Sequence, residues 1–155
     1  MATTTKSAAA GLGQLESVLD EYLVKKAPAL PANIKELLVK FAPYLTIIGV
    51  VLVVPALLAA FSAGAWLSSN YYWAMGGTTL GWQYYLALGL SAVTVVLEAL
   101  AIPGLFSRKM SGWKLLFYGI LVNTVYSLVY FNLMGLLLGT LISLYFLFQV
   151  RSYYH

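Results

Sequence analysis

Hydrophobic residues run with little interruption over long parts of this chain. From Phe41 to Leu97 no side chain carries a charge, and two more apolar runs follow residue 112. Residues 44–67 are apolar on every side of a helix rather than on one face, as expected when lipid is the solvent. The pattern predicts four transmembrane helices, at residues 44–67, 82–102, 113–131 and 134–150.

The chain ahead of the first span has a different pattern. Residues 1–11 are small and polar, and we expect a weakly structured tail there. Apolar residues then recur at helical spacing between residues 12 and 23, which predicts an amphipathic helix ended by Pro28 and Pro31. A second apolar stripe follows at residues 34–41. This segment anchors on the membrane surface, docks a partner, or packs against the cytosolic end of its own bundle.

Proline and glycine mark the remaining boundaries. Pro55 lies near the middle of the first span, where we expect a static kink. Residues 68–81 are predicted to form an uncharged aromatic loop, and Pro103-Gly104 is predicted to end the second span. The fold class is therefore an all-α polytopic membrane protein. A cytosolic amphipathic N-terminal segment (residues 1–41) precedes a four-helix transmembrane bundle (residues 42–155).

The basic residues give this bundle an orientation. All nine lie before the first span, between the second and third, or after the fourth: Lys6, Lys25, Lys26, Lys35, Lys40, Arg108, Lys109, Lys114 and Arg151. Lys and Arg accumulate in cytoplasmic segments, so both termini are expected in the cytoplasm. The net charge of +4 follows from this topology, and no nucleic-acid partner is expected.

Aromatic residues gather near the predicted membrane boundaries. The outer group is Trp66, Tyr71, Tyr72, Trp73, Trp82, Tyr84 and Tyr85, and the inner group is Trp113, Tyr153 and Tyr154. Amphipathic rings are typical of both interfaces of a membrane protein, so we interpret both groups as aromatic belts.

Small residues at four-residue spacing predict where the helices pack. Each span has a face of this kind, with residues three or four positions apart: Ala56, Ala60 and Gly64 in the first, Ala87, Ser91, Thr94 and Glu98 in the second, Gly119, Asn123 and Ser127 in the third, and Gly135, Gly139 and Ser143 in the fourth. Small side chains let helix backbones approach closely in lipid. The faces serve the folding of this bundle, and the Gly135/Gly139 face is also a candidate for homodimerisation.

Glu98 is the one acid that follows Glu36, and it shares a helical stripe with Ser91 and Thr94. An acid at mid-bilayer costs about 2.5–3.5 kcal/mol on the insertion scale and by default indicates a functional site. The predicted span ends only four residues later, however, which places Glu98 near the cytosolic boundary. Three interpretations remain open: an ion pair with a basic residue of the following loop, an ion or proton site of a transporter, and a contact to a partner subunit.

The basic residues within reach of Glu98 on this placement are Arg108, Lys109 and Lys114, whose long side chains can extend along the helix end. Asn123 lies deeper in the third span. An amide there is expected to make a hydrogen bond between helices.

The residues of common enzyme sites are missing. The chain has no cysteine, and its one histidine is the last residue, His155. A His-based triad, a zinc helix and a nucleotide-binding loop are all excluded, so neither enzyme activity nor a cofactor or metal is expected. We interpret the protein as structural or accessory: a small subunit, an assembly factor or a membrane-organising factor. Its partners are the lipid bilayer and another membrane protein or a second copy. The alternative is a small oligomeric transporter or channel that uses Glu98.

The last third of the chain carries a resemblance. The segments GLFSRKMSGWKLLFYG (residues 104–119) and LYFLFQVRSYY (residues 144–154) resemble a group of small, uncharacterised four-span membrane proteins of bacteria. These share a basic hairpin loop followed by Gly-Trp, and a terminal tail of aromatic and basic residues. The resemblance covers about residues 100–155. It implies the bacterial cytoplasmic (inner) membrane and no particular activity.

Overall fold

Helices make up most of the described part of the protein. A computed structural model describes residues 2–74 and 81–155, with side chains at 9–66 and 81–155. Its α-helices are α1 (Ala2–Asp20), α2 (Ala32–Ala74), α3 (Trp82–Phe106), α4 (Met110–Val129) and α5 (Leu141–Gln149). Two π-helical segments, η1 (Glu21–Lys26) and η2 (Gly135–Thr140), and a short 3-10 helix, η3 (Arg151–Tyr153), complete it. No strand occurs within those ranges, which confirms the all-α expectation.

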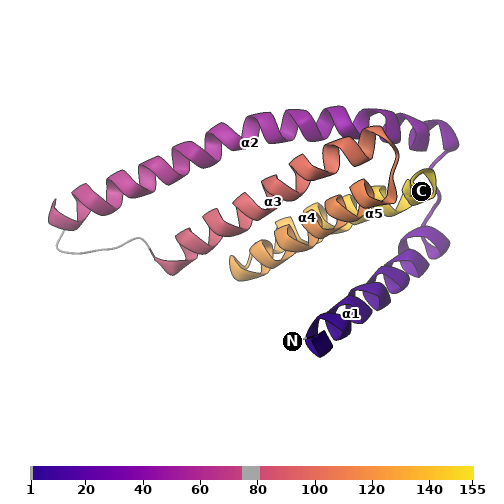
Figure 1. Cartoon of the computed structure of the whole chain (residues 1–155), viewed down its shortest axis with the longest axis horizontal. Helices are drawn as coiled ribbons and strands as arrows, with labels where there is room; N and C mark the ends of the chain where they lie inside the picture. The colour runs from indigo at the N-terminus through magenta and orange to yellow at the C-terminus, as the bar shows by residue number, and fades with distance from the viewer. Residues whose placement is uncertain (1, 75–80) are drawn as a thin grey trace.

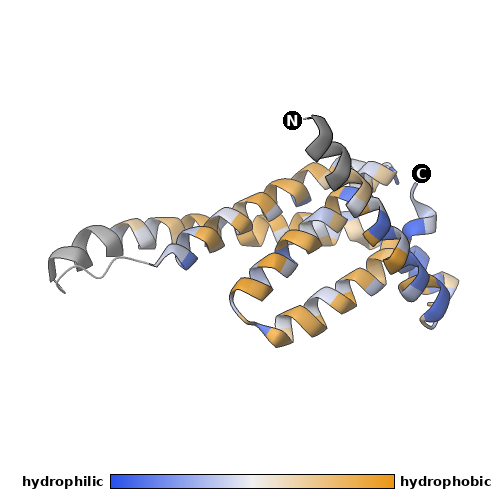
Figure 2. Ribbon diagram, turned by 90° about the horizontal axis from the view of Figure 1, so that it is seen from below, coloured by the Kyte–Doolittle hydropathy of each residue, from blue (hydrophilic) through white to orange (hydrophobic). Residues whose placement is uncertain are grey.

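Three of these helices are long and apolar enough to cross a membrane. They are the part of α2 from Ala32 to Trp66, α3, and α4, and hydrophobic residues dominate their length in Figure 2. The apolar helix Gly135–Gln149, formed by η2 and α5, is shorter. At 1.5 Å per residue it measures about 22 Å, against about 30 Å for the hydrocarbon core.

The termini of the helices differ from the sequence prediction in several places. Residues 2–11 were expected to be weakly structured but are helical, because α1 begins at Ala2; alanine, abundant here, is the strongest helix former. The backbone of α2 stays helical to Ala74, into the predicted loop, and residues 75–80 lie outside the described part. The boundary at residues 41/42 lies inside α2, which continues through Pro43 and Pro55.

The sequence predicted that Pro103-Gly104 would end α3, and that prediction is wrong. α3 runs on to Phe106, and the reversal of the chain comes at Arg108, whose φ of 50° is in the left-handed region. Proline removes one backbone donor but leaves the remaining bonds of the turn possible. The Lys109 N–H donates to the Gly104 carbonyl at 2.8 Å and closes the turn.

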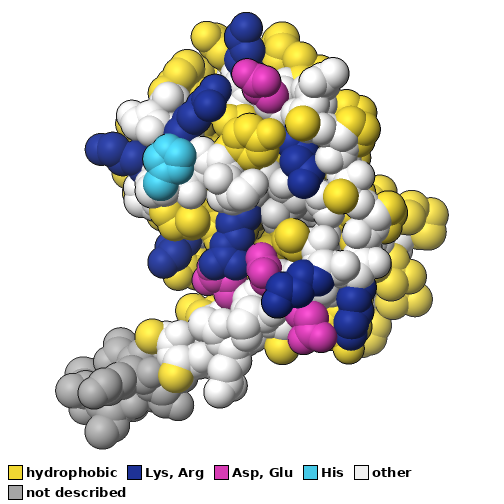
Figure 3. All heavy atoms as spheres, turned by 90° about the vertical axis from the view of Figure 1, so that its right-hand side faces the viewer, with side chains coloured by type: hydrophobic (Ala, Val, Ile, Leu, Met, Phe, Trp, Pro, Cys, Tyr) yellow, Lys and Arg dark blue, Asp and Glu magenta, His cyan; other side chains and the backbone are white. Residues whose placement is uncertain are grey.

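Helices α2, α3, α4 and α5 run broadly alongside one another, whereas α1 crosses them (Figures 1 and 2). α2 arches over α3, and α4 and α5 pack together beyond α3 (Figure 1). The α3–α4 turn, the C-terminal residues and the connection from η1 to α2 meet at one end, which we call the basic end. The Lys, Arg, Asp and Glu side chains gather there (Figure 3).

The hydrophobic core also lies at the basic end, around three aromatic rings. Trp113, Phe117 and Phe148 are each at most 1% exposed. Trp113 stacks on Phe117 with a centroid distance of 5.6 Å, and Phe148 meets both rings edge-on. Trp113 and Tyr154 were expected in a membrane-interface belt, but both are buried, because α5 and the C-terminus cover them. The outer-belt residues Tyr71, Tyr72 and Trp73 lie outside the described side chains.

Two glycines set the distance between α3 and α4. A methyl group built on Gly104 would lie 2.7 Å from the backbone of Gly112, and one built on Gly112 would lie 2.6 Å from the backbone of Gly104. Only hydrogen fits between the helices at this point. The sequence pattern predicted a helix end at Gly104 and no packing face at Gly112.

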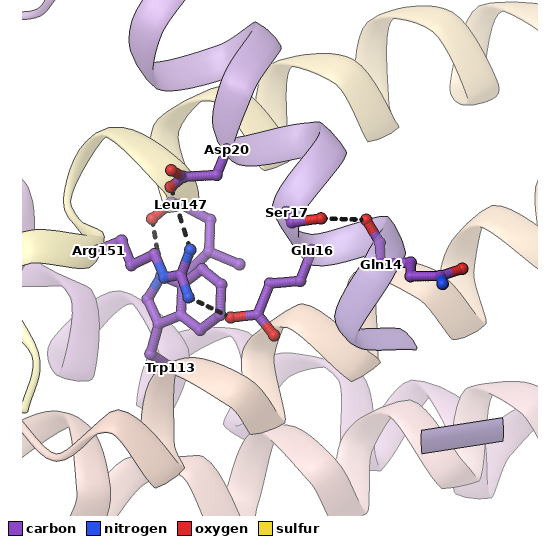
Figure 4. A network of polar contacts seen from close by, with 7 residues as sticks. All are labelled: Gln14, Glu16, Ser17, Asp20, Trp113, Leu147 and Arg151. Atoms are coloured by element: carbon purple, nitrogen blue, oxygen red, sulfur yellow. Dashed lines mark hydrogen bonds and ion pairs between the residues drawn. The ribbon is translucent and has the colours of Figure 1, made fainter. Parts of the chain in front are cut away.

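The N-terminal segment is attached to the basic end by polar contacts (Figure 4). Arg151 binds Glu16 at 2.5 Å and Asp20 at 3.1 Å, and its guanidinium lies 5.2 Å from the Trp113 ring centroid. The buried Gln149 side chain donates to the Leu23 carbonyl at 2.7 Å. Of the three interpretations of residues 12–41, packing against the protein's own bundle therefore describes this face of the segment.

The close approach of α3 and α4 leads to a first prediction. Gly112→Ala should lower the free energy of unfolding in mild detergent by about 1–3 kcal/mol, because the added methyl must push two backbones apart. Gly49→Ala is the matched control: its methyl meets nothing within 4 Å, and alanine favours the helix by about 1 kcal/mol. Equal stability of Gly112→Ala and the unmodified protein would contradict the role of Gly112.

Candidate functional site

Glu98 lies deeper in its helix than the sequence indicated. Because α3 continues to Phe106, eight residues separate Glu98 from the helix end, a distance of about 12 Å at 1.5 Å per residue. The side chain is partly buried. This depth places the carboxylate within the apolar part of the bundle rather than at its boundary.

The Glu98 carboxyl group faces a cavity. The cavity has a volume of about 460 Å³ and is walled by α2, α3, α4, η2, α5 and the C-terminal segment. Its polar lining includes Thr94, Glu98, Asn123 and Ser143. The lining extends from Leu38 and Tyr154 at the basic end toward the middle of α3 and α4. Three of the four predicted polar-site residues, Thr94, Glu98 and Asn123, therefore share one space.

A second cavity adjoins the first. It has a volume of about 320 Å³ and is lined by Val53 of α2, by Leu90, Ser91, Thr94, Val95 and Glu98 of α3, and by Asn123 and Tyr126 of α4. Both cavities share Thr94, Glu98 and Asn123. The fourth predicted polar residue, Ser91, belongs to this second space. The polar site thus lies where two cavities meet.

The Glu98 carboxylate forms no ion pair with any described side chain. Among the described residues the ion pairs are Lys26–Glu21, Arg151–Glu16 and Arg151–Asp20, and no hydrogen bond reaches Glu98. The expected partners Arg108 and Lys109 are exposed in the turn after Phe106, too far from Glu98 to pair with it. The expected hydrogen bond of Asn123 between helices is likewise not formed with any described residue.

Glu98 is the charged residue of the larger cavity. No Lys or Arg lines that cavity, and the other titratable side chain in its lining is Tyr154. Burial raises the pKa of Tyr154, and nearby Arg108 offsets part of that effect. The phenol therefore stays neutral at physiological pH, and Glu98 is the one charged side chain in the lining.

The predicted packing faces divide into two groups. Gly64 is buried against Tyr84 of α3, whose hydroxyl donates to the Ala60 carbonyl, so this part of the first face does pack. Ala56 is exposed. In the other group, a methyl on Gly119 or Gly139 would meet nothing within 4 Å, and both residues line the larger cavity with Ser143. Gly135 contacts the Asn132 side chain of its own turn.

The contact between α4 and η2 is made by threonines that sequence reasoning missed. The Thr124 and Thr140 hydroxyls lie 3.2 Å apart, and Thr124 also donates to the Ile120 carbonyl at 2.8 Å. Each threonine directly follows a residue of a predicted face, Asn123 or Gly139. A shift of one position turns a helix by about 100°. Gly139 itself opens on the larger cavity.

Within the described ranges no group of three His, Cys, Asp or Glu side chains is placed to hold a metal ion. Comparisons with models of protein families, with curated proteins and with solved structures found no match to this chain.

The unpaired state of Glu98 leads to a second prediction. Glu98→Leu should leave the protein folded and raise its free energy of unfolding by at most about 3 kcal/mol, because it removes a costly charge without leaving a basic group behind. Glu98→Gln, which keeps the shape, is the companion variant. Denaturant unfolding in mild detergent measures both. A destabilised Glu98→Leu protein would mean that the carboxylate holds a structural partner.

Proposed function

We propose that this protein is a small multi-pass subunit with a structural or accessory role in a membrane assembly. The observation that carries the proposal is the surface of α2. None of residues 44–63 is buried, and α2 has 43 residues, about 64 Å at 1.5 Å per residue. It extends beyond the rest of the bundle (Figure 1). Such a helix offers a partner a long apolar face that the bundle itself does not use.

The proposed topology has four spans: α2, α3, α4 and the Gly135–Gln149 helix. The turn between the last two supports it. The Asn132 side chain accepts the Gly135 N–H at 2.9 Å, and the Asn132 carbonyl accepts the Leu136 N–H at 2.8 Å. The turn also exposes Phe131, Leu133 and Met134 by 87%, 64% and 68%. A turn that satisfies its own backbone and carries apolar side chains is suited to the edge of the hydrocarbon.

In this proposal the basic end faces the cytoplasm of a bacterium, with both termini inside and the spans in the inner membrane. The gathering of Lys and Arg at that end supports the orientation. The likeness of residues 104–119 and 144–154 to small bacterial membrane proteins supports the location.

Transport is a second candidate function, because two cavities adjoin at Glu98. A transporter needs polar space along the membrane normal, and an intramembrane acid is a common ion or proton site. In this candidate Glu98 would bind the cation, with Thr94 and Asn123 beside it. An oligomer of the chain would complete the path.

The topology can be tested by labelling single cysteines, since the chain has none of its own. Gly81→Cys, where a side chain meets nothing within 4 Å, should react with an impermeant maleimide on intact cells. Ser152→Cys should react only after permeabilisation. Phe131→Cys should react from outside if the last helix crosses. If Phe131→Cys stays unlabelled in both conditions while Gly81→Cys reacts, the α4–α5 hairpin re-enters rather than crosses.

The accessory role can be tested with a photo-cross-linking amino acid at Leu52, which is 68% exposed on α2. One membrane protein, or a second copy of the chain, should be captured in near-stoichiometric yield. The same amino acid at Phe117, 1% exposed, is the control and should capture none. Lipid adducts alone at Leu52, with a cation flux in liposomes that Glu98→Gln abolishes, would reject the accessory role in favour of transport.

A further inference from the structure

The larger cavity has the construction of a small-molecule site. Its volume of about 460 Å³ lies in the range of ligand pockets, which are mostly apolar with a few polar groups. The apolar walls come from three helices: Leu38 and Leu45 of α2, Leu116 and Ile120 of α4, and Phe146 and Leu147 of α5. The polar side chains of its lining are Thr94, Glu98, Asn123, Thr140, Ser143 and Tyr154.

The charge of the cavity selects the ligand. Glu98 is its one acid, no Lys or Arg lines it, and no described residue pairs with the carboxylate. A charge in a low-dielectric site interacts strongly with an opposite charge that enters. A cation bound there would be compensated by Glu98, whereas an anion would meet an uncompensated like charge.

The groups beside Glu98 favour a cation that also donates hydrogen bonds. The Thr94 and Ser143 hydroxyls and the Asn123 amide line the same cavity and can accept. A protonated amine has up to three N–H donors, enough for the carboxylate and one or two of these oxygens. The apolar walls then require that the rest of the molecule be hydrophobic.

From this geometry we propose that the cavity between α2, α3, α4 and α5 binds a small amphiphile with one protonated amine. The amine lies at Glu98, and the apolar body extends along α4 and α5 toward Leu38 and Tyr154. The inference goes beyond the accessory role, because it holds whether or not the ligand is carried across the membrane.

Two other occupants of this cavity, a lipid chain and a second copy of the protein, fit less well. A lipid chain would fill the apolar walls but leave Glu98 without a counter-charge. A second copy of the chain could not supply one from the apolar stretch of its α2, because no residue from 41 to 97 is charged.

The test compares three probes of one shape: 4-phenylbutylamine, 4-phenyl-1-butanol and 4-phenylbutyrate. Their affinities are measured by calorimetry on the full chain in zwitterionic nanodiscs, with empty nanodiscs subtracted for partitioning. The amine should bind at least about tenfold more tightly than the alcohol, because a charge-assisted hydrogen bond is much stronger than a neutral one in a dry site. The butyrate should bind most weakly.

Three variants locate the interaction. Glu98→Gln should reduce the affinity for the amine to that for the alcohol. Glu36→Gln removes an equal charge from the exposed surface of α2 and should leave the preference for the amine unchanged. Gly139→Leu should weaken the amine and the alcohol together, because its side chain enters the cavity from a position where nothing lies within 4 Å.

The proposal fails if the unmodified protein binds the amine and the alcohol equally, or binds none of the probes; neither comparison depends on a variant that must fold. It also fails if folded Glu98→Gln keeps the preference for the amine, since binding would then lie elsewhere. A preference for the amine that depends on Glu98, in a protein that captures no partner through Leu52, would reject the accessory role and leave this site standing.

Discussion

The close approach of α3 and α4 at Gly104 and Gly112 is the constraint on which the rest of the bundle depends. Helices in lipid gain little from a hydrophobic force and associate by packing closely. The two glycines let the backbones meet directly. With α3 fixed against α4, Trp113 is turned inward under α5, and Glu98 and Asn123 face the same cavities. A larger residue at either glycine would alter both the aromatic core and the polar site.

Polar contacts between the N-terminal segment and the C-terminal residues stabilise the basic end. Gln149 bonds to Leu23 and Leu30 of the N-terminal segment, and the His155 carbonyl accepts the Met110 N–H at 2.8 Å. Arg151 faces two acids while its guanidinium lies over the Trp113 ring. Exposed ion pairs contribute only up to about 1 kcal/mol each. Here they act together with a buried amide, so the N-terminal segment is held by several weak contacts in one place.

The sequence predicted the kind of structure well and its contacts poorly. Long charge-free runs predict apolar helices because lipid imposes that composition over a whole span. The position of a helix end depends on competing local interactions. Pro103 suggested a helix end, yet α3 continues past it to Phe106, with Gly104 packed against Gly112. Which face of a helix makes a contact depends on how the helix is rotated about its axis. The α4–η2 contact is made by Thr140, one residue after the predicted Gly139. The sequence drew attention to Glu98 and Asn123 because an acid and an amide are conspicuous in long apolar runs, and both line the two cavities.

The cost of Glu98 is large for a protein of this size. An acid within the membrane costs about 2.5–3.5 kcal/mol on the insertion scale, and small proteins are stable by only about 5–15 kcal/mol in total. A structural acid recovers that cost through an ion pair or hydrogen bonds, as Glu16 and Asp20 do with Arg151. Glu98 has no such contact among the described residues. The fold therefore gains nothing visible from this side chain, and its purpose is best sought in what enters the cavity beside it.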